Sequence, residues 1–179
     1  MNKDKNSKQI CITGTTNRYQ IKKLNKPSET SAKRVLTKKW SFACVDCDQM
    51  GVLLRLHDNV NDDMTKIMRH EIQTKIYGYK RQDISRKLFN EDNFLGFTDV
   101  VSALIESRLR CTYCNNVMLI LYDTSREMSQ WSVDRIDNSL GHIADNYHIA
   151  CLKCNLARRR KSHESFLFTK QLQIIKCDG

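Results

Sequence analysis

The sequence lacks long apolar runs. No stretch of about 18 or more consecutive apolar residues occurs in its 179 residues, so we expect no transmembrane helix. The first residues are rich in Lys and Asn and lack the apolar core of a secretory signal, which favours a soluble, intracellular protein. Because 40% of the residues are hydrophobic, the chain can bury a modest core, and this excludes a wholly disordered protein.

Acidic residues are scarce at the N-terminal end. Residues 1–40 hold eleven Lys or Arg against two acidic residues, whereas residues 41–179 hold nineteen against eighteen. Nearly all of the net charge of +10 therefore lies in the first forty residues. A basic arm of this kind raises encounter rates with DNA or RNA. A solvated leader or a localisation signal has the same composition.

Large apolar side chains are also few in this N-terminal segment, which holds the only proline, Pro27. The composition predicts a basic, flexible arm over 1–40, with one short strand near 10–13. We expect the folded part to begin near Trp40. We find no internal repeat in the chain.

The region 41–110 has apolar residues at helical spacing. One helix is expected behind the acidic pair Asp62 and Asp63, which suits the positive end of a helix dipole, and it should end at Gly78. Its apolar positions are Met64, Ile67, Met68, Ile72 and Ile76.

Two further segments complete this region. The polar, basic segment 80–87 fits either a short helix that lies along a phosphate backbone or a plain solvated face. Thr98 is a candidate N-cap for a second amphipathic helix that leads directly to Cys111. The region is therefore expected to be mainly helical.

From residue 111 onward, short apolar runs alternate with polar turns. They predict strands over 117–122, 131–136 and 147–150, followed by a helix over 151–162. The sequence thus predicts an α+β protein with three parts: a basic flexible arm (1–40), a mainly helical accessory region (41–110) and a C-terminal module (111–179).

Two Cys-x2-Cys pairs, Cys111/Cys114 and Cys151/Cys154, have the spacing of a tetrahedral zinc site. Eight cysteines in a secreted chain would suggest disulfides, but in a reducing compartment this spacing indicates metal ligands. Four thiolates leave no open coordination position, so the zinc ion is expected to be structural. It would stabilise a core that is too small to fold alone.

A third pair, Cys44 and Cys47, is not followed by an unclaimed second pair at ligand spacing. It could be half of a second zinc site, completed by residues elsewhere in the chain: His57, His70, Cys11 or Cys177. The other interpretation is that both are buried or free thiols.

The sequence between and just after the two zinc-type pairs resembles the HNH endonucleases, which have the ββα-metal fold. Its matching residues are the run Asp134-Arg-Ile-Asp137, then Gly141-His142, Asp145-Asn146 and finally Cys151-x2-Cys154-Asn155. The likeness covers about residues 111–162 and is of the type common in phages and large DNA viruses. It implies that 111–179 is a zinc-stapled ββα-metal module that hydrolyses phosphodiester bonds in DNA.

The resemblance also implies a role for each matching residue. Asp134 would be the carboxylate ligand of a catalytic divalent cation, and Asn155 the amide-oxygen ligand opposite it. Oxygen ligands at both positions suit Mg²⁺ or Mn²⁺ better than zinc. Such a cation stabilises the charge that develops on the phosphate and the leaving oxygen. Asn146 matches the middle Asn of the motif, which holds the loop by hydrogen bonds.

One position departs from the family pattern. The family commonly has His directly after the metal-binding Asp, where this chain has Arg135. Arginine keeps its proton at working pH and is a poor base, but Arg135 could clamp a phosphate. The attacking water would then need another acceptor, either Asp137 or His142, and we favour His142. His148, on a predicted strand, is expected to be a packed or surface residue.

Four consecutive cations continue the predicted helix beyond Asn155: Arg158, Arg159, Arg160 and Lys161. Because they fan around the helix, several are expected to reach phosphates on either side of the cut. Binding should then weaken steeply with salt. The alternative is a solvated face, with Asp134 and Asp137 in surface salt bridges to nearby arginines and Asn155 a cap of the zinc knuckle.

The sequence therefore predicts an HNH-like endonuclease with structural zinc and a catalytic Mg²⁺ or Mn²⁺, acting on duplex, branched or single-stranded DNA. A lone site of this kind cuts one strand, so a double-strand break would require a homodimer or two visits. The rival is a zinc-containing DNA- or RNA-binding module that has lost cleavage, which Arg135 favours. A protein-interaction domain would leave Asp134, Asn146 and Asn155 without a purpose.

Overall fold

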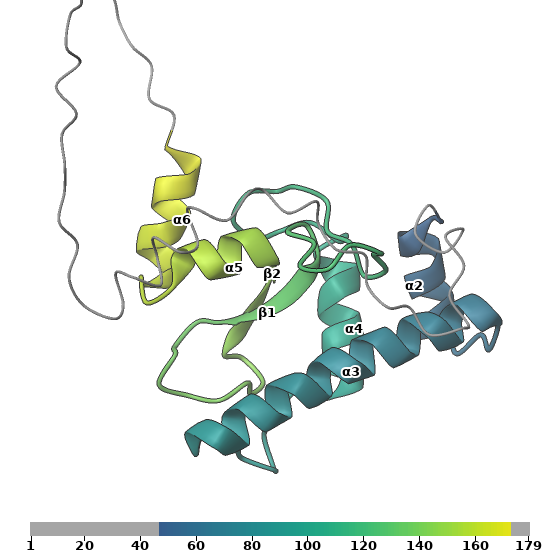
Figure 1. Ribbon diagram of the computed structural model, residues 1–179, viewed down its shortest axis with the longest axis horizontal. Helices are drawn as coiled ribbons and strands as arrows, with labels where there is room; N and C mark the ends of the chain where they lie inside the picture. Colours follow the sequence, from purple (N-terminus) through teal and green to yellow (C-terminus); the bar gives the residue numbers. More distant parts are fainter. Residues whose placement is uncertain (1–46, 173–179) are drawn as a thin grey trace, which may run out of the picture. The chain divides into compact units, whose positions relative to one another are not determined.

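The computed structural model describes residues 47–172. Several sequence predictions concern other residues: the arm over 1–40, the strand near 10–13, the start of the fold near Trp40, and Cys44 of the third cysteine pair. These lie outside the described residues and stay predictions. Within 47–172 the chain forms five helices and one two-stranded antiparallel sheet, which confirms the predicted α+β class (Figure 1).

The first described helix, α2 (Gln49–His57), is not predicted by the sequence analysis. The Asp48 side chain caps it by accepting a hydrogen bond from the Gly51 N–H at 3.1 Å. The Gln49 side chain accepts from the N–H of Leu121 and donates to its carbonyl oxygen, both at 2.9 Å. These bonds attach α2 to the segment that follows the first cysteine pair.

The long helix α3 (Asp63–Arg86) confirms the helix predicted behind Asp62. The side chains of Asp62 and Thr65 form a reciprocal capping box at its start. The predicted end at Gly78 is wrong, because α3 continues to Arg86 and takes in most of the basic segment 80–87. A glycine inside a helix costs only about 1 kcal/mol, and the residues beyond it are held by contacts with the C-terminal module.

The next helix, α4 (Phe97–Glu106), confirms the second predicted helix but not its cap. Its N-cap is Gly96, and the carboxylate of Asp99 accepts the Gly96 N–H at 2.7 Å. The acidic residue therefore performs the capping that the sequence analysis assigned to Thr98. A short turn, rather than the helix itself, leads to Cys111.

The sheet consists of β1 (Trp131–Arg135) and β2 (Tyr147–Cys151), with Trp131 opposite Cys151 and Arg135 opposite Tyr147. These bounds confirm the predicted strands over 131–136 and 147–150 to within one residue. The strand predicted over 117–122 is wrong, because that run makes only isolated bridges, one to Arg110 and one to Gln130.

The helix predicted over 151–162 is interrupted. It forms as α5 (Leu152–Arg158), and the chain then turns at Arg159, whose φ is 54°. A separate helix, α6 (His163–Gln171), begins after its N-cap Ser162. The break separates Arg158, the last residue of α5, from the three cations that follow it.

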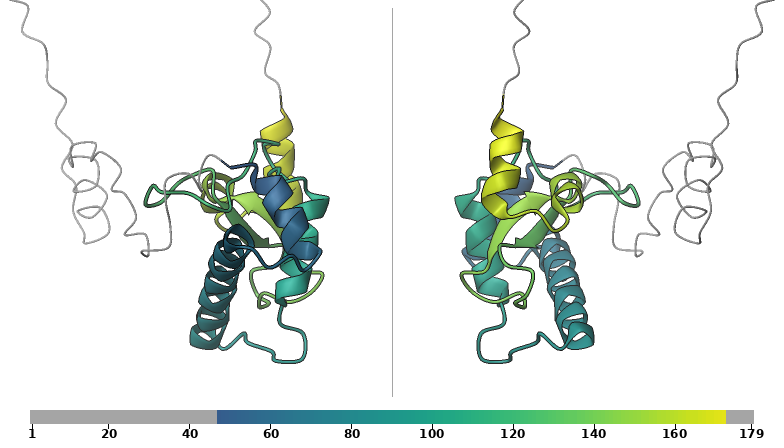
Figure 2. Two further views of the ribbon diagram at one scale, coloured as in Figure 1. Left: turned by 90° about the vertical axis from the view of Figure 1, so that its right-hand side faces the viewer. Right: turned by 90° about the vertical axis from the view of Figure 1, so that its left-hand side faces the viewer.

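A single hydrophobic core joins α2, α3 and α4 to the C-terminal module; it includes Leu53, Met68, Leu104, Trp131 and Ile149. In the views of Figures 1 and 2, α5 and α6 lie on one side of the sheet and α3 on the other. None of the helices within 47–172 has the length and apolar character needed to cross a membrane.

The edge of β1 that does not pair with β2 lies along α3. The Val133 N–H donates to the Tyr79 hydroxyl at 3.0 Å, and the Lys75 ammonium donates to the Trp131 carbonyl. Burial raises the pKa of Tyr79 to about 12, so its hydroxyl stays protonated. The accessory helix therefore fixes the position of the strand that carries Asp134.

Candidate functional site

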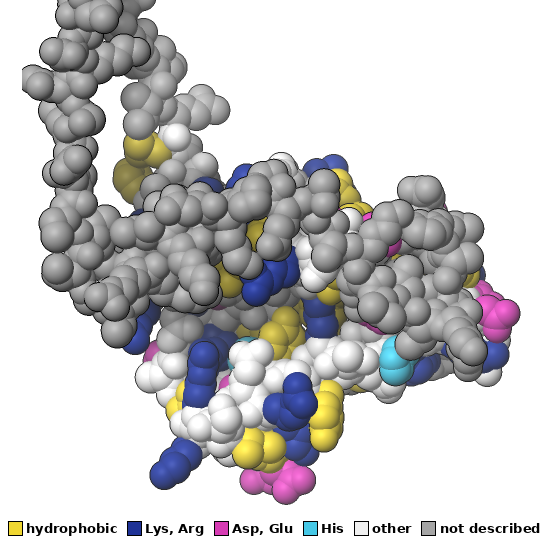
Figure 3. Space-filling view, in the orientation of Figure 1, with side chains coloured by type: hydrophobic (Ala, Val, Ile, Leu, Met, Phe, Trp, Pro, Cys, Tyr) yellow, Lys and Arg dark blue, Asp and Glu magenta, His cyan; other side chains and the backbone are white. Residues whose placement is uncertain are grey.

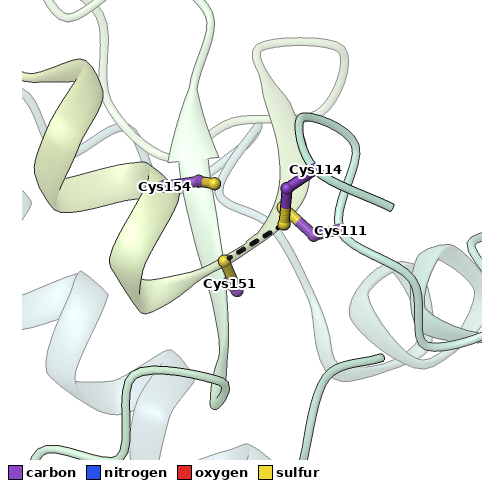
Figure 4. A group of neighbouring side chains, drawn as sticks. All are labelled: Cys111, Cys114, Cys151 and Cys154. Atoms are coloured by element: carbon purple, nitrogen blue, oxygen red, sulfur yellow. Dashed lines mark hydrogen bonds between the residues drawn. The ribbon is translucent and has the colours of Figure 1, made fainter. Parts of the chain in front are cut away.

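Four cysteine side chains meet beside the sheet. Their Sγ atoms all lie within 4.8 Å of one another and point toward a common centre (Figure 4). Cys151 ends β2 and Cys154 lies in the first turn of α5, while Cys111 and Cys114 lie on the turn that follows Arg110. The cluster predicted from spacing is thus present in space.

The geometry of this cluster fits zinc. A tetrahedral zinc ion with zinc–sulfur bonds of about 2.3 Å holds its sulfurs about 3.8 Å apart, and the Sγ atoms of Cys114 and Cys151 are 3.8 Å apart. A hydrogen bond from the Cys151 thiol lowers the pKa of Cys111, while the hydrogen bond to Cys111 raises the pKa of Cys151 and burial raises that of Cys154. Zinc binding would therefore have to displace protons from thiols of this cluster. With four sulfur donors, such an ion would be structural.

The proposed carboxylate ligand, Asp134, is buried in an ion pair. It is 4% exposed, and it accepts the Tyr113 hydroxyl at 2.7 Å on Oδ2. Arg158 donates from Nε to Oδ2 at 2.7 Å and from Nη2 to Oδ1 at 3.0 Å. The alternative interpretation of the sequence expected Asp134 to pair with a helix arginine, although at the surface rather than in the interior.

Arg158 is itself only 1% exposed. Its guanidinium also donates to the carbonyl oxygens of Arg135 and Lys161, so it links β1 to the turn after α5. Arg158 therefore does not face solvent in this structure, whereas the sequence analysis expected it to be among the cations that contact phosphates.

Asn155 lies against β1 from α5. Its Nδ2 donates to Ser132 Oγ and to the Val133 carbonyl oxygen, each at 3.1 Å. A carbonyl only accepts hydrogen bonds, so this contact fixes which end of the amide is nitrogen. The other end, Oδ1, has no hydrogen bond to any residue within 47–172. Asn155 therefore has an amide oxygen without a hydrogen bond, on a side chain that bonds to the two residues before Asp134.

Asp134 and Asn155 offer oxygen atoms, which are the ligands that hard cations such as Mg²⁺ prefer. A carboxylate has about four acceptor positions, and on Asp134 two on Oδ2 and one on Oδ1 are taken. One position on Oδ1 and the amide oxygen of Asn155 remain. The positive charge of Arg158, in contact with Asp134, opposes the binding of a cation here. Apart from the four cysteines, the described residues include no group of three or more His, Cys, Asp or Glu placed to hold a metal.

Asn146 makes the kind of loop contacts that the resemblance implies. It is 6% exposed, and its Oδ1 accepts the Asp137 N–H at 2.9 Å. Its Nδ2 donates to the carbonyl oxygens of Asp137 and Gly141, at 3.1 and 3.0 Å. These bonds close the loop between β1 and β2.

Arg135 and Asp137 also take part in this loop. Nη1 of the buried Arg135 donates to the Leu140 carbonyl oxygen at 2.7 Å, so this guanidinium is held inside the loop. Asp137 is exposed, and its Oδ1 accepts from the hydroxyl and the N–H of Ser139. These hydrogen bonds lower the pKa of Asp137 and keep it ionised.

His142 is anchored to α3. The ring nitrogen Nδ1 of His142 lies 2.8 Å from one carboxylate oxygen of Asp83, and the backbone N–H of His142 donates to the other oxygen at 2.6 Å. The ring also stacks on that of Tyr79, with 4.6 Å between the ring centroids. Burial lowers the pKa of His142, although the Asp83 carboxylate favours the charged form. The sequence analysis missed Asp83, whose only signal was a lone acidic residue within a basic segment.

Gly141 sits where a side chain would not fit. A Cβ there would lie 2.5 Å from the Leu88 carbonyl oxygen, whereas a Cβ on Gly78 would have nothing within 4 Å. Gly141→Ala should therefore destabilise the zinc-loaded chain by about 1–3 kcal/mol, and Gly78→Ala should stabilise it by about 0.5–1 kcal/mol. Urea unfolding measures both. Equal shifts in the two variants would contradict this packing.

Two histidines lie on the Asp134 side of the sheet. His148 stands opposite Asp134 on β2, and its ring centroid is 4.1 Å from that of His163 at the start of α6. Nδ1 of His163 lies 3.1 Å from the Tyr113 hydroxyl. Tyr113 occupies an unspecified position of the first Cys-x2-Cys pair, and His163 follows the region of likeness. Both were missed because a contact between residues 50 positions apart cannot be read from a local pattern.

The remaining cations of the basic run are exposed: Arg159, Arg160 and Lys161. They follow the end of α5 and are separated from Asp134 by the buried Arg158. Where described residues are visible in Figure 3, Lys and Arg side chains are interspersed with polar and hydrophobic ones.

Comparison of the chain with protein-family models, with the curated proteins and with solved structures finds no match. A functional interpretation therefore rests on the residues and their geometry.

Proposed function

We propose that the chain is a metal-dependent endonuclease of the HNH type, which hydrolyses phosphodiester bonds in DNA. One observation carries the proposal: Asn155 on α5 bonds to β1 at Ser132 and Val133, the two residues before Asp134, and its amide oxygen makes no hydrogen bond within 47–172. This pair of oxygen donors belongs to a two-stranded antiparallel sheet and a helix whose junction carries half of the cysteine cluster.

In this proposal, Asp134 and Asn155 hold Mg²⁺ or Mn²⁺, which when bound stabilises the negative charge that develops on the phosphate. Arg158 and Tyr113 orient the Asp134 carboxylate, and Asn146 holds the loop. Of the two candidate proton acceptors, Asp137 is exposed and His142 is buried, so solvent water reaches Asp137 more readily.

The exposed cations after α5 supply the contact with the DNA backbone in this proposal. Arg159→Gln and Arg160→Gln should each weaken binding to a labelled DNA duplex and reduce the slope of log affinity against log salt by about 0.9. Fluorescence anisotropy at several salt concentrations measures this. Lys66→Gln, an exposed charge change near the start of α3, is the matched control. Losses no larger than in that control would remove these arginines from the interface.

The test of the proposed function is nicking of supercoiled plasmid by the zinc-loaded wild-type chain. Open-circular product should form with Mn²⁺ or Mg²⁺ and should not form when both cations are omitted.

A second candidate is a zinc-containing nucleic-acid-binding module without cleavage. The ion pair between Asp134 and Arg158 favours it, because a guanidinium in contact with the carboxylate opposes binding of a further cation. Duplex binding without nicking in either cation would refute the endonuclease and support this module.

A further inference from the structure

We infer that the divalent cation of the proposed endonuclease binds this site together with a nucleic-acid phosphate and only weakly without it, because Arg158 cancels the charge of Asp134. The inference rests on the proposed function and concerns how that function is controlled.

The protein offers the cation no net negative charge at this point. Asp134 contributes one negative charge, and Arg158 contributes one positive charge in direct contact with it. Asn155 is neutral, and Tyr113 contributes a hydroxyl that donates to Asp134. The described residues provide no further carboxylate that would complete a metal cluster here.

Arg158 is built into this position. Besides Asp134 it bonds two backbone carbonyls, and it is 1% exposed, so it remains a fixed counter-ion rather than a mobile surface cation. A carboxylate so paired keeps its position but loses most of its attraction for Mg²⁺ or Mn²⁺.

A phosphodiester supplies the missing charge. Magnesium is commonly held by one or two carboxylates together with the phosphates of a substrate, and it keeps several waters otherwise. Asp134 and Asn155 would each supply one oxygen ligand to the cation, and phosphate oxygens and waters would supply the others. By thermodynamic linkage, the cation must then increase the affinity for DNA by the same factor by which DNA increases the affinity for the cation.

The experiment measures Mn²⁺ binding to the full, zinc-loaded chain by the loss of the free-Mn²⁺ electron paramagnetic resonance signal. Wild type is compared with Arg158→Gln, with Arg159→Gln as the matched change of an exposed arginine, and with the double variant Asp134→Asn/Arg158→Gln. A second arm measures wild type with a short DNA duplex and subtracts the Mn²⁺ bound by the duplex alone. Zinc content and circular dichroism monitor folding.

We expect Arg158→Gln to bind Mn²⁺ at least about tenfold more tightly than wild type or Arg159→Gln, and the double variant to lose this gain. With duplex, wild type should bind one additional Mn²⁺. Equal binding by wild type and Arg158→Gln without DNA, alongside plasmid nicking, would overturn the inference alone. No Mn²⁺ binding in any sample, together with no nicking, would overturn the proposed function as well. If Arg158→Gln loses zinc, the inference is decided by wild type alone, from its Mn²⁺ binding with and without the duplex.

Discussion

Replacing Cys154 with serine should abolish tight zinc binding and unfold most of the region from Cys111 onward. The four sulfurs come from two segments that are far apart in sequence and lie within 4.8 Å of one another. They connect a sheet of only two strands, which is marginally stable by itself in water. Zinc binding contributes on the order of 10 kcal/mol to the folding of small zinc modules, so its loss is comparable to the whole free energy of unfolding of a domain, which is about 5–15 kcal/mol.

The measurement combines zinc content per chain with circular dichroism and thermal unfolding. Cys47→Ser is the matched control, because Cys47 lies outside the cluster and should leave its zinc in place. Removal of zinc from wild type by a chelator should reproduce the Cys154→Ser result. Wild-type zinc content and unfolding temperature in Cys154→Ser would show that the cluster is not a zinc site.

Replacing Asn155 with alanine should reduce plasmid nicking by at least about a hundredfold while the chain keeps its zinc. In the proposed function the amide oxygen is one of only two protein ligands of the catalytic cation. The change also removes two hydrogen bonds to β1, each worth about 1 kcal/mol. Nicking is measured at saturating Mn²⁺, and zinc content and unfolding temperature are measured in parallel.

Ser132→Ala separates the two consequences of this change. It removes one hydrogen-bond acceptor of Asn155 Nδ2 but leaves the amide oxygen in place. It should therefore lower stability and retain most of the nicking. If Asn155→Ala nicks as fast as wild type, or if Ser132→Ala is equally inactive, the ligand role of Asn155 fails.

Local pattern was enough to locate several elements of this fold. Helical spacing located α3 and α4, and short apolar runs separated by polar turns located β1 and β2. The four-cysteine cluster was predictable because two ligands of each pair are neighbours in the chain, and the short spacing already constrains their geometry. The position of these helices and strands, and the geometry of each cysteine pair, depend mainly on residues that are close together in the chain.

Errors arose where distant residues determine the outcome. Gly78 did not end α3, because Tyr79 and Asp83, just beyond it, bond to the C-terminal module. The run 117–122 did not become a strand, and its backbone is instead bonded by Gln49 of the unpredicted α2. Local propensity does not contain these tertiary contacts.

The candidate site shows the same division. Its motif residues could be read from the sequence. Of their partners, only a helix arginine for Asp134 was among the alternatives, and it was expected at the surface. The pairing of Asp134 with Arg158 joins a strand to a helix, and the pairing of His142 with Asp83 joins a loop to the accessory helix. Side chains 24 and 59 positions apart meet only in the folded chain.

The covered edge of β1 has a consequence for self-association. An open strand edge is a template to which a strand of another molecule can add, and long exposed edges promote aggregation. Along β1 most outward backbone groups are already bonded: the Trp131 N–H to Leu119 and its carbonyl to Lys75, the Val133 N–H and carbonyl to Tyr79 and Asn155, and the Arg135 carbonyl to Arg158. Two copies of this chain therefore cannot join by strand addition at β1, and any homodimer must form through another surface.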